Sequence, residues 1–180
     1  MKTLILYESK RGSTQQYAED IGKLVLADVM PLKKYKWKNL DEYDIIVFGG
    51  WVKGNVIQGV DDFLSHYDEI KEKAVIIFAN GLSYPTTEGR DGLISGNILD
   101  LYHIRFYQLQ GKFDFAKLGM IEKMLVKSSV NRMQNDDNFT EEHKAQMLSL
   151  LTTKIDGYDQ NGVNKIVAVI NRIISGEAAK

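Results

Sequence analysis

Cysteine is absent from this sequence of 180 residues. Its absence excludes disulfide bonds, thiol nucleophiles, iron–sulfur clusters and zinc sites built on cysteine. It also fits a reducing compartment, and we expect a cytoplasmic protein. Proline occurs only twice, so an extended proline-rich linker is not expected.

An excess of charge of one sign and a long apolar run are also missing. The formal net charge is -1, whereas a nucleic-acid-binding protein usually carries a strong basic excess. No apolar run approaches the roughly 18–20 residues that cross a bilayer, so no transmembrane segment is predicted. The apolar run at the N-terminus is too short for a signal peptide. The three histidines, His66, His103 and His143, lack metal-ligand spacing, and no metal site or catalytic residue is predicted.

The chain instead alternates short apolar runs with amphipathic stretches. The apolar runs are typical of strands buried on both faces, and the amphipathic stretches of helices. Such alternation indicates an α/β protein with a parallel sheet and helices on both faces. Strands are predicted near residues 4–7, 29–32, 44–48, 74–79 and 104–109, and helices near 17–25, 60–67, 93–101 and 163–173.

One stretch, residues 111–159, is too long for a simple connection before the last helix. We interpret it as an extra helical segment within a single domain that spans residues 1–180. A helix is predicted over residues 117–133, and Thr140 is expected to cap a second one after a break at 135–138. The residues of the first helix expected to face inward are Leu118, Ile121, Met124, Leu125 and Ser128.

The connection between the first strand and the first helix is suited to binding a phosphate. A loop in this place points backbone N–H groups and the positive end of the helix at one spot. Serine and threonine add hydroxyl donors, and glycine lets the backbone turn tightly. Lys10 and Arg11 either neutralise the phosphate, contact a second anionic ligand, or point into water. The candidate residues are Ser9, Lys10, Arg11, Gly12, Ser13 and Thr14.

The same segment resembles the N-terminal signature of the flavodoxin-like superfamily. It contains neither a Walker loop nor G-x-G-x-x-G, and Gly49-Gly50 stands where a receiver domain needs an aspartate. The resemblance implies a flavodoxin-like three-layer sandwich, a five-stranded parallel sheet in the order 2-1-3-4-5, and flavin mononucleotide (FMN) as cofactor. The residues that match are Ile5, Leu6, Tyr7, Ser9, Gly12, Thr14, Ala18 and Ile21.

The resemblance also assigns two loops to the flavin ring. The loop after the third strand would pack on one ring face, with Trp51 as a stacking partner or as a cap on the core. The loop after the fourth strand would approach the pyrimidine end, where backbone amides tune the redox potential. The first loop comprises Gly50, Trp51, Val52, Lys53, Gly54 and Asn55, and the second Asn80, Gly81, Leu82, Ser83 and Tyr84.

Within the superfamily, the opening residues 1–6 and the extra segment resemble the flavodoxin-like protoporphyrinogen IX dehydrogenases of bacteria. That resemblance implies an FMN-dependent oxidoreductase that uses a small aromatic or quinone-like substrate. The alternative is a non-enzymatic electron carrier for a redox partner protein, although carriers are usually far more acidic. The predicted helix after Gly111 either makes a peripheral membrane or partner contact or packs on the domain.

Overall fold

The computed structural model describes residues 1–82 and 85–177, so the predicted site residues Ser83 and Tyr84 lie outside the described residues. The chain divides into two compact units. One consists of Met1–Gly111 together with the chain from Tyr158 onward, and the other of Lys112–Gly157. Each unit is described by itself.

The first unit is built on a parallel sheet with the strand order β2-β1-β3-β5-β6. The short β4 pairs antiparallel with β3 and lies off this path. When β4 is left out, β5 and β6 are the fourth and fifth strands, and the predicted order 2-1-3-4-5 is confirmed. The central strands are buried on both faces, as their uninterrupted apolar runs require. The strands are β1 (Thr3–Tyr7), β2 (Asp28–Pro31), β3 (Ile45–Lys53), β4 (Val56–Ile57), β5 (Ala74–Gly81) and β6 (Ile104–Gln110).

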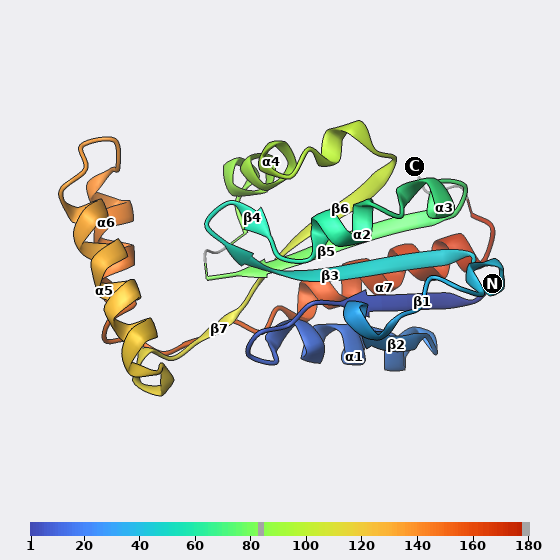
Figure 1. Cartoon of the computed structure of the whole chain (residues 1–180), viewed down its shortest axis with the longest axis horizontal. Coiled ribbons are helices and arrows are strands. Elements are labelled where there is room, and N and C mark those ends of the chain that lie inside the picture. The colour runs from blue at the N-terminus through green and yellow to red at the C-terminus, as the bar shows by residue number, and fades with distance from the viewer. Residues whose placement is uncertain (83–84, 178–180) are drawn as a thin grey trace. The chain divides into compact units, whose positions relative to one another are not determined.

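Helices cover both faces of this sheet (Figure 1). On one face, α1 (Ser13–Val25) and α7 (Gln160–Ile174) lie side by side over a core that includes Tyr17, Phe78 and Ile166. The other face packs against a second core cluster that includes Phe48 and Phe63. The helices there are α2 (Val60–Leu64), α3 (Tyr67–Ile70) and α4 (Thr87–Gly96).

Two predicted helices differ from the observed ones. The stretch predicted as one helix at 60–67 forms the two short helices α2 and α3. The helix predicted over 93–101 ends at Gly96, and a 3-10 turn follows at Leu99–Leu101. Between them Ile98 adopts a left-handed conformation with φ 54°, which breaks the helix.

The unit Lys112–Gly157 contains two helices and a small ladder. The ladder pairs β7 (Lys112–Phe113) with β8 (Ile155–Asp156), and a 3-10 turn at Phe115–Lys117 precedes α5 (Met120–Gln134). The predicted start of this helix at residue 117 is therefore wrong by three residues. The prediction for Thr140 is confirmed, since its hydroxyl accepts a hydrogen bond from the His143 N–H and caps α6 (Glu141–Ser149).

The prediction that Leu118, Ile121, Met124, Leu125 and Ser128 face inward is confirmed for Leu118 and wrong for the other four, since Ser128 is exposed as well. Ile121, Met124 and Leu125 are 71%, 64% and 59% exposed, whereas Leu118, which precedes the helix, and Val130 are buried. Helical spacing shows which residues share a face but not whether another element covers that face. Within the described chain, no helix is long and apolar enough to span a membrane.

The hydroxyl of Tyr17 on α1 holds both ends of the chain that flank Lys112–Gly157. It donates to the Gln110 carbonyl at 2.7 Å and accepts from the Asp159 N–H at 2.6 Å. The Tyr17 ring stacks on Tyr158 with centroids 4.9 Å apart, and the Tyr158 hydroxyl donates to Asp20 Oδ2. Burial raises the pKa of Tyr17 to about 12, so its hydroxyl stays protonated near neutral pH and can act as a donor.

We expect Tyr17→Phe to lower the free energy of unfolding by about 1–3 kcal/mol, because it leaves a partly buried carbonyl and a partly buried N–H without this partner. Chemical denaturation measures this loss. The ring of phenylalanine retains the contacts with Phe78 and Tyr158, so a loss near zero would mean that the two hydrogen bonds contribute nothing.

Candidate functional site

The predicted phosphate loop (residues 9–14) leads into the N-terminus of α1. Gly12 adopts φ 88°, and among the described residues no side chain caps the helix that follows. Ser9 Oγ accepts from the Gly12 N–H at 3.1 Å and folds the loop back on itself. Thr14 is 1% exposed, and its hydroxyl has no partner within the described part of the chain. An uncapped helix end beside an unsatisfied buried hydroxyl fits an anionic ligand.

Lys10 links this loop to the end of β3. Its Nζ lies 5.5 Å from the centroid of the Trp51 ring, within the range of a cation–π interaction. Two of the predicted site segments are thus brought together by a side-chain contact. An ion pair that sequence reasoning missed lies at the same end of the sheet, where Lys33 after β2 meets Glu8 after β1 with Nζ and Oε1 3.4 Å apart.

The prediction of a loop at residues 50–55 is wrong. Gly50, Trp51, Val52 and Lys53 belong to β3, and Gly54 and Asn55 form a two-residue connection to β4. Gly54 has φ 62°, which suits a tight hairpin with glycine in first place. We call this element the β3–β4 hairpin (residues 51–57). Tryptophan, valine and isoleucine on both sides of a Gly-Asn pair favour such a hairpin.

Asn80 and Gly81 form the last two positions of β5, next to the hairpin in the sheet. Asn80 pairs in register with Trp51, and a Cβ on Gly81 would lie 3.1 Å from Cβ of Val52. The Asn80 side chain is 5% exposed, and its Oδ1 has no partner within residues 1–82 and 85–177. Leu82 follows the strand and is half-buried.

All three segments therefore lie at the carboxyl end of the sheet. The phosphate loop follows β1 and the hairpin extends β3, and between these neighbouring strands the strand order reverses. In open α/β sheets, this reversal is where ligands bind. Two buried polar atoms that lack a partner among the described residues, Thr14 Oγ1 and Asn80 Oδ1, lie in these segments. The geometry defines a flavodoxin-like α/β protein whose site fits a phosphate-bearing ligand.

A comparison with protein families leads to the same flavodoxin-like class. A family model described as a flavodoxin domain matches residues 4–141, and the chain belongs to this family. FMN is accordingly its cofactor. The residues described above fit it through the phosphate cradle at α1 and the adjoining strand ends.

Several solved structures resemble the chain at low identity. The Trp repressor binding protein from Bacillus subtilis is 15% identical, with a TM-score of 0.48 over 61% of this chain and 85% of that one. A flavoprotein in complex with FMN from Lactobacillus acidophilus is 17% identical, with a TM-score of 0.46 over 61% and 91%. Oxidised flavodoxin 1 from Bacillus cereus is 16% identical, with a TM-score of 0.42 over 83% and 98%. Among curated proteins, none matches the chain.

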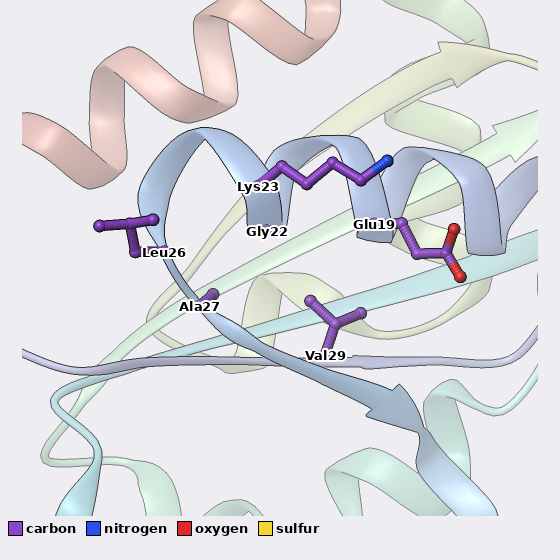
Figure 2. Close-up of a pocket in the computed structure, with 6 residues that line it drawn as sticks. All are labelled: Glu19, Gly22, Lys23, Leu26, Ala27 and Val29. Atoms are coloured by element: carbon purple, nitrogen blue, oxygen red, sulfur yellow. The ribbon is translucent and has the colours of Figure 1, made fainter.

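A separate pocket lies between the second half of α1 and the start of β2 (Figure 2). Val29 points from β2 towards the helix, and Leu26 projects away from it. The pocket is at the amino end of β1 and β2, whereas the phosphate loop is at their carboxyl end. Among the described residues there is also no cluster of acidic or histidine side chains that could hold a metal ion.

Proposed function

We propose that the chain is an FMN-dependent oxidoreductase. The phosphate would bind in the phosphate loop, and the isoalloxazine ring would lie between the β3–β4 hairpin and residues 80–82. When bound, FMN takes up an electron pair with protons from a reduced substrate and passes them to an oxidised acceptor. The protein's part is to bind the cofactor, orient it and set the charge around it.

The main support for placing the FMN phosphate in this loop is the buried hydroxyl of Thr14. A hydroxyl that is 1% exposed costs free energy unless it has a partner, and Thr14 lacks one among the described residues. It lies in the first turn of a helix whose N-terminus no described side chain caps. A phosphate in the loop supplies the missing acceptor, and the helix end supplies further donors.

The charges near the proposed flavin favour an enzyme over a carrier. Lys10, Arg11 and Lys53 are exposed on the segments that form the site, and Lys33 stands beside Glu8 at the same edge. Carriers that dock on basic partners need an acidic surface there. A cationic edge instead suits a substrate with carboxylates or polar oxygens, such as a porphyrinogen or a quinone. We place this reaction in the cytoplasm.

An anaerobic redox titration of the FMN-loaded protein tests this proposal. We expect reduction in one two-electron step, followed by reoxidation with a soluble quinone over many turnovers. Oxidation of protoporphyrinogen IX, followed by porphyrin fluorescence, tests the narrower substrate. Reduction in two well-separated one-electron steps without turnover would instead indicate the carrier. A purified protein that takes up no FMN would contradict both functions.

The exposed apolar residues of α5 support a peripheral membrane contact of the proposed enzyme, where a quinone is dissolved. Met120 is 88% exposed, and Lys123 and Lys127 each lie about 6 Å from the Phe115 ring. Basic and apolar side chains on one helix are typical of interfacial binding. Cosedimentation with anionic lipid vesicles measures this contact. Absence of the protein from the vesicle pellet would contradict it.

A further inference from the structure

The side chain of Asn97 ties the β3–β4 hairpin to the end of α4. Its Oδ1 accepts from the Ile57 N–H at 2.9 Å, and its Nδ2 donates to the carbonyls of Asn55 and Leu93, both at 2.8 Å. The side chain is 7% exposed, so these hydrogen bonds are largely shielded from water. Both N–H donors of the amide and its carbonyl are used.

At its base the hairpin is held by the sheet and the core, since Trp51 pairs in register with Asn80 of β5 and Ile57 is buried, but its tip at residues 53–56 is exposed. Its β4 strand pairs with β3 at two positions only, Val52 with Ile57 and Lys53 with Val56. A two-stranded hairpin of this size is marginally stable without outside contacts. Gly96 lets α4 approach closely, because a Cβ at this position would lie 3.2 Å from the carbonyl oxygen of Asn55. Asn97 and Gly96 therefore form the anchor of the hairpin on the helix.

Asn97 directly follows Gly96, the last residue of α4. The other end of this helix is capped by Thr86, whose hydroxyl accepts a hydrogen bond from the Gly89 N–H at 3.0 Å. The C-terminus of α4 therefore holds the hairpin, and a displacement there would move the tip of the hairpin.

We propose that Asn97 is a positioning residue for the flavin ring. Its hydrogen bonds to Asn55 and Ile57 fix the hairpin. The position of the hairpin in turn sets how far Trp51 and Lys53 lie from one side of the flavin ring and how polar that side is. The inference rests on the proposed FMN site, but it concerns a residue outside the phosphate loop and outside the ring-facing segments.

The test compares FMN with riboflavin, which lacks the phosphate, in Asn97→Ala. Because the phosphate loop is intact, we expect both dissociation constants to rise about tenfold, which corresponds to about 1.4 kcal/mol. The ratio of the two constants stays as in the wild type. The visible absorption of the bound flavin and its midpoint potential shift as well, since the polarity beside the ring changes.

Two further variants keep the test decisive. Gly96→Ala pushes on the Asn55 carbonyl while Asn97 is retained, and we expect the same changes at a few-fold size. If Asn97→Ala does not fold, the Gly96→Ala variant is used in its place. Tyr43→Phe is the control for lost stability alone. It removes a 2.8 Å hydrogen bond to Asp28 at the amino end of the sheet, and we expect flavin affinity, spectrum and potential to be unchanged.

The outcomes separate the two proposals. A wild-type protein that binds neither flavin contradicts the proposed function itself. If the wild type binds both flavins but Asn97→Ala and Gly96→Ala leave riboflavin affinity, spectrum and potential unchanged, the positioning role is wrong. If Tyr43→Phe changes these quantities as much as Asn97→Ala does, Asn97 acts through stability alone, and the proposal is wrong as well.

Discussion

The double variant Gly12→Val/Thr14→Ala is expected to bind FMN about 100-fold more weakly than the wild type, or worse. Gly12 has φ 88°, and a β-branched residue held there costs about 1–3 kcal/mol. Loss of the Thr14 hydroxyl would remove the proposed hydrogen bond to the phosphate, and a hydrogen bond to a charged group is worth about 1.5–3 kcal/mol. Each 1.4 kcal/mol is about tenfold in the dissociation constant. Quenching of FMN fluorescence on titration with protein measures the change.

Thr14→Ser is the matched control for this prediction. It keeps the hydroxyl at the start of α1, so FMN binding should remain near that of the wild type. Riboflavin provides a second control, because the double variant should bind it almost as well as the wild type does. An FMN affinity unchanged by the double substitution would show that the phosphate lies elsewhere.

The largest loss of stability is expected for Gly49→Ala, at about 3 kcal/mol. A Cβ at this position would lie 2.7 Å from both Cε atoms of the Phe78 ring and closer still to its tip. Phe78 is fully buried in the neighbouring strand, so its ring cannot move without displacing the core around it. Urea denaturation followed by circular dichroism measures the free energy of unfolding.

The same substitution at Gly92 gives the control. Gly92 lies inside α4, and a Cβ there would meet nothing within 4 Å. Alanine favours a helix over glycine by about 1 kcal/mol, so Gly92→Ala should leave stability unchanged or raise it slightly. Equal losses at both positions would mean that the contact with Phe78 is not what requires glycine at position 49.

The sheet was predictable because its strands are uninterrupted apolar runs between polar breaks. Their order, which followed from the family resemblance, was predicted as well. The end of β3 was not predictable, because two consecutive glycines, Gly49 and Gly50, are typical of the end of a strand. In the structure these glycines leave room for the side chains of Phe78 and Ile57, and the strand continues to Lys53. Glycine for close packing and glycine for a turn look alike until the neighbouring side chains are known.

The phosphate loop was recognisable from the sequence because its residues are contiguous and follow a family signature. The anchor at Asn97 was not, because its partners at Asn55 and Ile57 lie 42 and 40 positions away. The helical spacing of apolar residues continues past Asn97 to Leu101. The sequence does not reveal the break at Ile98, because a left-handed conformation is rare for a β-branched residue and is not expected there. Contacts made by tertiary structure leave no local pattern.

The hydrogen bonds of Tyr17 have a consequence for how this chain can be rebuilt. Gln110 and Asp159 are both within hydrogen-bond reach of one oxygen atom, so the chain leaves the sheet and returns to it at nearly the same point. A short turn is enough to close such a gap, and a much longer segment costs little more in loop entropy. We therefore expect that Lys112–Gly157 can be replaced by another module at this position without loss of the sheet and the helices that cover it.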